Sequence, residues 1–408
     1  MTTPSGKPRV ALLGCGTVGS AVTAELLSPA WRDRVDLTHI LVREPARPRP
    51  VPPEAAPLLT TSFDDILDAA PDLVIELLGG LDPATDHIAR ALARGVRVVT
   101  ANKTVMARHG PNLLDLARAS DAAIACEAAV CAGLPILAAL ENLRPGGVKR
   151  IAAIVSGSCN FILTRLAAGV PMERALDAAR ARGLVEPDPT ADLSARDAAE
   201  KACVLAAAAG FPSLTPADVP TEGITSITSD DLAAARRTGH TIKLLAELDF
   251  TGDAPTARVG PTLVPLSHPL AAVHDEDNAA LITTRLAGDL FLKGRGAGPG
   301  PTASAVLGDV ARLLGLRAAA NPAIQPARTP PRPRGSFIRA AAAESITPQR
   351  AFAALERHGL AVRELSLARG VAHALVPDAN DGAARACATE LASGGESLVI
   401  PLIGAAAP

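Results

Sequence analysis

The chain has 408 residues and a net charge of −2, and 48% of its residues are hydrophobic while only 2% are aromatic. A chain of this length should hold two or three domains, and it has ample apolar side chain for large cores. The lack of basic excess and the absence of Tyr argue against nucleic-acid binding. No run is long and apolar enough to span a bilayer, and the first residues lack the apolar core of a signal peptide.

The six cysteines are scattered along the chain, with no C-x-x-C pair and no cysteine–histidine cluster of zinc-binding spacing. The eight histidines form no H-x-x-x-H pair, and none is assigned a role. In a chain without a secretory signal, such cysteines are expected to be reduced and buried. These features predict a cytoplasmic protein.

A glycine-rich turn lies near the N-terminus, between a predicted strand over 10–13 and a predicted helix over 21–27. It reads G-C-G-T-V-G. In this context G-x-G-x-x-G makes a tight turn, lets the backbone approach a pyrophosphate, and directs a helix N-terminus towards it. The alternative is a merely tight turn between strand and helix. We predict a dinucleotide site formed by Gly14, Gly16, Thr17, Val18 and Gly19.

The tip of the second predicted strand bears on the choice of cofactor. This strand runs over 35–42 and is followed by Arg43 and Glu44, with Arg47 and Arg49 close behind. An acidic residue at such a tip holds the ribose 2′-hydroxyl of NAD, whereas an Arg accommodates the 2′-phosphate of NADP. Arg43 therefore favours NADP, and Glu44 leaves NAD open.

Strands and helices continue to alternate as far as residue 145. Further strands are predicted over 73–78, 96–100 and 122–127. This order predicts an open parallel sheet, so the segment should form a Rossmann-type, doubly wound α/β domain. Lys103 follows the strand at 96–100 in the run T-A-N-K, at the edge where such sheets bind ligands. In isolation, a lysine at that position is more often an ordinary residue of a helix start.

An acidic, proline-stiffened loop begins at Glu186 and leads into an alanine-rich helix that should end at Gly210. Asp192 is the predicted N-cap of this helix. Asp197 and Lys201 are four residues apart and share one helix face. Such a pair is usually a solvated salt bridge. Beside the acidic loop, it could instead bind an ammonium group and move a proton.

The run E-P-D-P-x-x-D-L-x-x-x-D-x-x-x-K, over 186–201, resembles the substrate and catalytic segment of homoserine dehydrogenases. The resemblance covers residues 8–318 in order and includes T-A-N-K, S-G-S-C-N at 156–160 and P-T-A-S-A-V at 301–306. The S-G-S-C-N run should also cap the helix that follows it. It implies reversible, NADPH-dependent reduction of L-aspartate 4-semialdehyde to L-homoserine, in the biosynthesis of threonine, methionine and isoleucine. The alternatives are another NAD(P)-dependent dehydrogenase of small amino or hydroxy acids, or a non-catalytic amino-acid sensor on the same scaffold.

The resemblance also implies roles for individual residues. Lys201 would donate the proton to the carbonyl oxygen, with Asp197 fixing its position, and Lys103 would sit between nicotinamide and substrate. Lys201 would suit this task if burial and Lys103 lowered its pKa towards the working pH. The substrate's amino-acid end would meet the three carboxylates of Glu186, Asp192 and Asp197. The cofactor would also contact Lys103, Gly183 and Gly298.

Homoserine dehydrogenases use the segment that corresponds to 127–135 to hold a monovalent cation, Na⁺ or K⁺, chiefly through backbone carbonyls. Matching by position assigns this role to Glu127, Val130, Ala132 and Leu134. Cys131 departs from the pattern, because the family usually has a small residue there, most often Gly. The cation site therefore depends on whether the backbone at Cys131 can follow the path that glycine allows.

The rest of the chain is expected to form a substrate-binding, catalytic and dimerisation domain over 146–320, then a Pro-rich linker over 321–335. Residues 336–408 should form a ferredoxin-like domain of the ACT type, which often makes homoserine dehydrogenases sensitive to threonine. The D-x-P-G turn of that domain is missing, and Ser345-Ile346-Thr347-Pro348 stands in its place. We therefore expect a domain kept for shape or assembly and an enzyme largely insensitive to threonine. The resemblance also implies a homodimer or homotetramer that acts on a small molecule.

Overall fold

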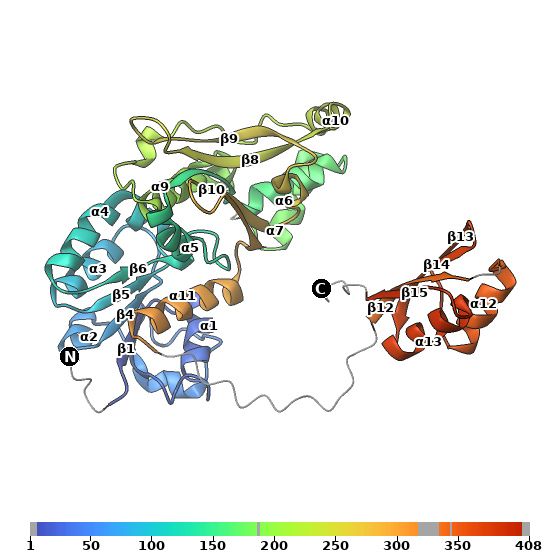
Figure 1. The fold of residues 1–408 in the computed structure, drawn as a ribbon. Helices are drawn as coiled ribbons and strands as arrows, with labels where there is room; N and C mark the ends of the chain where they lie inside the picture. Colours follow the sequence, from blue (N-terminus) through green and yellow to red (C-terminus); the bar gives the residue numbers. More distant parts are fainter. Residues whose placement is uncertain (1–5, 186–187, 317–333, 343–344, 402–408) are drawn as a thin grey trace. The chain divides into compact units, whose positions relative to one another are not determined.

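The computed structural model describes residues 6–185, 188–316, 334–342 and 345–401. The chain divides into two compact units, residues 1–317 and 318–408 (Figure 1). Within the described residues, no helix is both long and apolar enough to cross a membrane.

The first unit begins with a six-stranded parallel sheet in the order β3-β2-β1-β4-β5-β6. Side chains alternate between its two faces, so that Leu12 joins the core under α1 while Leu13 joins the core under α2, α3 and α4. Burial on both faces explains the continuous apolar runs of these strands. The predicted doubly wound fold is confirmed, with these bounds: β1 Arg9–Leu13, α1 Thr17–Leu26, β2 Asp36–Leu41, β3 Leu59–Thr60, α2 Phe63–Asp68, β4 Leu73–Glu76, α3 Ala84–Ala93, β5 Arg97–Thr100, α4 Lys103–Ala119 and β6 Ile124–Ala125.

A second, antiparallel sheet follows in the order β11-β10-β7-β8-β9. Helices α5 to α10 contribute to one large core against it, which includes Phe161, Leu205 and Ile282. The sequence did not predict β9 and β11. The bounds are α5 Ile136–Leu143, β7 Val148–Ile154, α6 Gly157–Ala167, α7 Met172–Ala181, α8 Thr190–Leu193, α9 Arg196–Ala209, α10 Ser229–Arg237, β8 His240–Asp249, β9 Thr256–Pro265, β10 Asp277–Thr284 and β11 Asp289–Arg295.

The last helix of the first unit, α11 (Pro299–Leu313), returns to the nucleotide-binding sheet. Its residues Val306 and Val310 belong to the same core as Leu12 and Ile75, and the helix lies beside α1 in Figure 1. Part of the range expected for the substrate domain thus packs on the parallel sheet. The chain passes twice between the two sheets, which places residues from both at one site.

The second unit is a four-stranded antiparallel sheet, in the order β13-β14-β12-β15, with two helices. Its elements follow the predicted order of strand, helix, strand, strand, helix, strand. Ile346 is buried in its core, and Thr347 caps α12. The bounds are β12 Arg334–Ala341, α12 Pro348–Arg357, β13 Glu364–Ala368, β14 Val371–Ala379, α13 Asp381–Ala392 and β15 Ser397–Pro401.

Candidate active site

The glycine-rich turn between β1 and α1 has a physical reason for each of its glycines. Gly14 has φ +96°, and a Cβ there would lie 2.7 Å from the carbonyl oxygen of Leu77. A Cβ on Gly19 would lie 2.1 Å from the carbonyl oxygen of Gly14, so this glycine lets helix and strand pack closely. Gly16, the N-cap of α1, faces open space and leaves room for a pyrophosphate at the helix N-terminus.

The loop after β2 is held by one of its own arginines. The Arg49 guanidinium donates to the backbone carbonyls of Glu44 at 2.7 Å, Arg47 at 2.7 Å and Pro45 at 3.3 Å. Arg43 is exposed at the strand tip, and no hydrogen bond or ion pair with another described residue engages its side chain. Its guanidinium is therefore accessible to a ligand.

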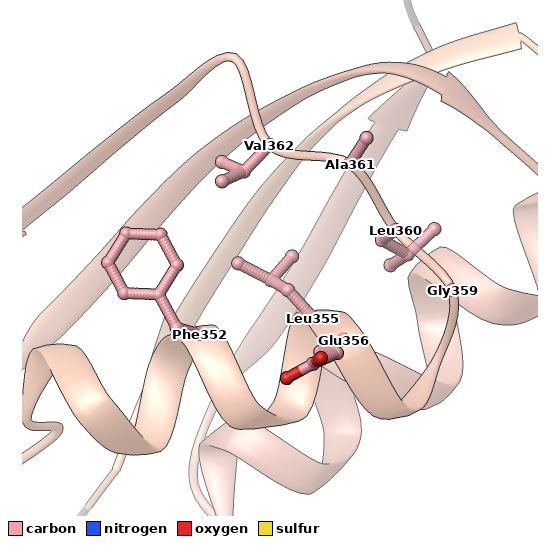
Figure 2. Close-up of a pocket in the computed structure, with 7 residues that line it drawn as sticks. All are labelled: Phe352, Leu355, Glu356, Gly359, Leu360, Ala361 and Val362. Carbon is pink, nitrogen blue, oxygen red and sulfur yellow. The ribbon is translucent and has the colours of Figure 1, made fainter.

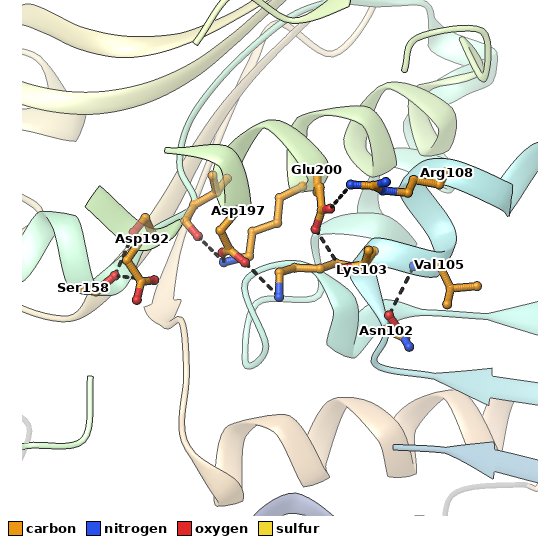
Figure 3. Close-up of polar contacts among 12 residues, drawn as sticks. Asn102, Lys103, Val105, Arg108, Ser158, Asp192, Asp197 and Glu200 are labelled. Carbon is orange, nitrogen blue, oxygen red and sulfur yellow. Dashed lines mark hydrogen bonds and ion pairs between the residues drawn. The ribbon is translucent and has the colours of Figure 1, made fainter. Parts of the chain in front are cut away.

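Lys103, Asp197 and Lys201 meet where α4 faces α9. Figure 3 shows Lys103 and Asp197 at this contact. One Asp197 oxygen lies 2.8 Å from Lys103 Nζ, and the other lies 2.7 Å from Lys201 Nζ. The side chains of Lys201 and Asp197 are only 16% and 22% exposed, so the pair is not a solvated surface salt bridge. Lys103 is the first residue of α4, whose N-terminus is capped by the Asn102 side chain. The carboxylate thus joins the parallel sheet's helix to the second sheet's helix.

The two lysines control the charge state of Asp197. Burial acts to raise the pKa of Asp197, but the ammonium groups of Lys201 and Lys103 outweigh it and lower the value to about 2. Burial likewise acts to lower the pKa of Lys201, but Asp197 outweighs it and the pKa is raised. The expectation of a lowered pKa for Lys201 is therefore wrong, because the nearest charge is the bound carboxylate. Lys201 remains an ammonium at neutral pH.

Among the described residues, two acceptors bind the ammonium group of Lys201. Its Nζ donates to the Asp197 carboxylate and to the carbonyl oxygen of Val155, at 2.9 Å, just after β7. A lysine ammonium has three N–H groups. The third is available for a substrate oxygen, with the other two fixing the direction of the nitrogen.

The acidic segment before α9 is broken, contrary to the sequence-based expectation. Asp192 lies in the short helix α8 and does not cap α9, which starts at Arg196 after Ala195 in a left-handed conformation with φ +62°. The break has a tertiary cause, because the Leu193 carbonyl accepts the N–H of Ile224 at 3.0 Å instead of continuing the helix. The predicted end at Gly210 is confirmed, with φ +105°.

Asp192 is tied to the first turn of α6. Its Oδ1 accepts a hydrogen bond from Ser158 Oγ at 3.3 Å, and its carbonyl oxygen lies 3.3 Å from Cys159 Sγ. Ser156 caps α6, as its position in the S-G-S-C-N run predicts. The predicted substrate ligand Glu186 lies outside the described residues.

The two remaining cofactor candidates lie at helix ends. Gly183 follows α7 with φ +67°, and Gly298 is the N-cap of α11 with φ +105°. A Cβ on nearby Gly296 would lie 2.1 Å from the side-chain carbon of Asn278. Glycine is therefore required in the segment that leads back to the parallel sheet.

The segment matched to the family's cation loop keeps a tight path without glycine at its centre. Cys131 and Ala132 have φ +57° and +35°, and both are buried. Among the described residues, no hydrogen bond reaches the carbonyl oxygens of Val130 and Ala132. The carbonyls of Glu127 and Leu134 each accept one backbone N–H. The described residues contain no group of three or more His, Cys, Asp or Glu side chains that could hold a metal ion.

Glu200 is a site residue that sequence reasoning missed. Its carboxylate accepts a hydrogen bond from Thr104 Oγ1 at 2.8 Å and lies 3.7 Å from the Arg108 guanidinium, both on α4 (Figure 3). Like the Lys103–Asp197 pair, these contacts join α9 to α4. No local pattern indicates these contacts, because Thr104 and Glu200 are 96 residues apart in the sequence.

Known proteins resemble the chain along most of its length. The family described as homoserine dehydrogenase matches residues 135–311, and the homoserine dehydrogenase NAD-binding domain matches residues 14–127. The homoserine dehydrogenase of Synechocystis sp. is 39% identical over 334 residues, which cover 78% of this chain and 76% of that protein. That of Mycobacterium tuberculosis is 40% identical over 327 residues, which cover 76% and 74%.

Solved structures agree with these matches. The homoserine dehydrogenase of Thiobacillus denitrificans superposes with a TM-score of 0.70 and 29% identity, covering 98% of this chain and 99% of that one. A hyperthermophilic archaeal homoserine dehydrogenase in complex with NADPH has a TM-score of 0.65 and 25% identity, covering 78% and 100%. Neither the sensor nor another dehydrogenase class is favoured. The chain belongs to the homoserine dehydrogenase family, and it is an NAD(P)-dependent oxidoreductase that acts on a CH–OH group.

Proposed function

We propose that Lys201 donates a proton to the carbonyl oxygen of L-aspartate 4-semialdehyde while a hydride adds to the carbonyl carbon, which gives L-homoserine. The bound nicotinamide cofactor supplies the hydride. The observation that carries this proposal is the Asp197 carboxylate, which holds Lys201 and Lys103 on its two oxygens. Loss of NADPH absorbance on adding the semialdehyde, with homoserine as product, is the direct assay.

The charge state of Lys201 supports its role as a general acid. An ammonium with a raised pKa is fully protonated at neutral pH and can give its proton to the developing alkoxide. Asp197 and the Val155 carbonyl orient the nitrogen, which leaves the third N–H for the substrate. In homoserine oxidation the same nitrogen must first lose its proton.

The other charged groups bind and orient the reactants. Lys103 lies between the nicotinamide and the substrate, and its contact with Asp197 supports this role. Asp192 meets the substrate's amino-acid end from beside the first turn of α6. Glu186 completes this acidic pair.

NADP is the preferred cofactor, supported by the exposed Arg43 and the braced loop behind it. We expect Arg43→Ala to shrink the ratio of kcat/KM for NADPH over NADH by about 10-fold, the scale of a lost hydrogen bond to a charged group. Arg97→Ala, at the exposed amino end of β5, is the control and should leave the ratio unchanged. Equal efficiency of the unmutated enzyme with both cofactors would contradict the proposal.

A monovalent cation binds at the 127–134 segment, where the carbonyls of Val130 and Ala132 are its ligands together with those of Glu127 and Leu134. The buried, left-handed turn at Cys131 and Ala132 supports this arrangement. The ion would fix the loop that begins α5. Titration of the salt-free enzyme with Na⁺ and K⁺ in a thermal unfolding assay tests the site.

The enzyme is a homodimer or homotetramer. Five large apolar side chains of the first unit support this, because they are exposed in and around its antiparallel sheet: Leu263, Leu266, Leu286, Leu290 and Phe291. Light scattering gives the mass in solution that decides between these states.

The enzyme is largely insensitive to threonine. The turn before α12 supports this, because Pro348 has no N–H to offer a carboxylate and Ile346 is buried in the core of its unit. The pocket in Figure 2, along α12 and the loop that follows it, is lined by apolar residues and Glu356, whose negative charge would repel a carboxylate. Activity at saturating substrates should stay constant as threonine rises through the millimolar range. Inhibition that disappears on truncation near Arg328 would contradict this.

A further inference from the structure

Glu76, the last residue of β4, is fully buried and has no role in the mechanism above. One carboxylate oxygen accepts the backbone N–H groups of Leu78 at 2.7 Å and Gly79 at 3.4 Å. The other accepts Thr100 Oγ1, at the end of β5, at 2.5 Å. No ion pair within the described residues includes Glu76. A buried carboxylate without a cation must be stabilised by such donors, so these three contacts determine its position.

The contacts of Glu76 belong to a closed ring of hydrogen bonds. Thr100 Oγ1 also accepts the N–H of Asn102 at 2.9 Å. The Asn102 amide donates to the carbonyl oxygen of Gly80 at 2.7 Å, and its oxygen caps α4 by accepting the N–H of Val105 at 3.2 Å. The ring therefore joins the loop after β4 to the loop after β5.

Both joined loops border the reacting groups. The loop after β4 starts at Leu77, whose carbonyl oxygen would lie 2.7 Å from a Cβ on Gly14 and is therefore close to the dinucleotide turn. The loop after β5 leads directly into Lys103, whose Nζ binds Asp197. Both loops leave the carboxyl ends of adjacent parallel strands, the edge where such sheets bind ligands. Glu76 thus links the cofactor side of the site to its proton-transfer side.

We propose that Glu76 is a positioning residue for hydride transfer, which fixes the loop beside the cofactor relative to Lys103. The carboxylate does this by accepting from both loops at once, with one oxygen towards each. A glutamine could keep both contacts, because the Thr100 hydroxyl can accept from its amide nitrogen, whereas a methionine of similar length accepts from neither loop. The proposal rests on the proposed functions of Lys103 and Lys201.

The test is Glu76→Met, assayed with NADPH and with NADPH deuterated at the transferred position of C4. Because a displacement of about 1 Å can cost up to about 100-fold in rate, we expect kcat to fall by about 10- to 100-fold. The affinity for NADPH and the KM for the semialdehyde should change far less. The deuterium isotope effect on kcat should increase, because hydride transfer becomes the slow step.

Three further variants define the contact. Thr100→Val removes the same hydrogen bond and should reproduce the kinetic change, and the double variant should be no worse than either single one. Thr100→Ser keeps the hydroxyl, so its kcat should be near that of the unmutated enzyme. Asp72→Asn is the matched control, because this carboxylate accepts the Arg9 N–H at 2.7 Å at the opposite end of β4. It should leave kcat and the isotope effect unchanged.

A purely structural role would lower the fraction of folded enzyme and leave kcat per active site and the isotope effect at wild-type values. That result in both Glu76→Met and Thr100→Val would overturn the proposal, and Thr100→Val decides alone if Glu76→Met does not fold. Failure of the proposed function can be distinguished from failure of the Glu76 proposal, because it would appear as normal turnover in a Lys201 variant.

Discussion

Lys201→Ala should lower kcat for semialdehyde reduction by about 10²- to 10⁴-fold, the range expected for a lost general acid. The loss follows from the arrangement of the ammonium, which is held by Asp197 and the Val155 carbonyl with one N–H left for the substrate. NADPH affinity, measured from the fluorescence of the bound cofactor, should remain near the wild-type value. This combination separates a chemical role from a binding role.

Lys149→Ala is the matched control for this experiment. Lys149 is exposed on β7, the strand that leads to Val155, so the variant removes one lysine without touching the site. It should turn over normally. If Lys201→Ala also turned over normally, the Asp197–Lys201 pair would be a salt bridge with a structural role alone, and another group would donate the proton.

Asp197→Asn should move the pH dependence of homoserine oxidation to lower pH. In this direction Lys201 must be neutral to accept a proton, so kcat/KM rises with pH through the pKa of Lys201. Asp197 raises that pKa in the unmutated enzyme. The amide removes the negative charge while burial remains, and burial by itself lowers the pKa of Lys201. The rising limb of the profile should therefore appear at a lower pH in the variant.

In the reducing direction the rate depends on pH in the opposite sense, because Lys201 must be protonated to donate. The unmutated enzyme keeps Lys201 protonated across neutral pH, so its rate should be flat there, whereas Asp197→Asn should lose activity as pH rises. Full pH–rate profiles in both directions measure this. Glu200→Gln is the control, because its carboxylate lies on the same helix but contacts Thr104 and Arg108. An oxidation limb that stays at the same pH in Asp197→Asn would show that Asp197 does not control the charge of Lys201.

Much of this molecule could be predicted from local sequence, because local physical constraints act within a few residues. The G-x-G-x-x-G run specifies a turn in which Gly14 needs a positive φ and Gly19 needs close packing, and both are found. Continuous apolar strands imply burial on two faces and hence a parallel sheet. Cap residues such as Ser156 and Gly210 act on the nearest turn of their own helix, so their predictions hold.

Predictions failed where a distant segment competed with the local one. Asp192 is a good N-cap by type, yet the helix starts later, because the Leu193 carbonyl bonds to Ile224. No rule based on neighbouring residues includes that contact, because Ile224 is brought in by the fold.

The electrostatics of the site depended most on tertiary structure. Spacing alone determined that Asp197 and Lys201 share a helix face. It could not determine that the pair is buried or that Lys103, from the other sheet's helix, occupies the second carboxylate oxygen. The direction of a pKa shift is a balance between burial and neighbouring charge, and both quantities arise only when segments from different parts of the chain pack together.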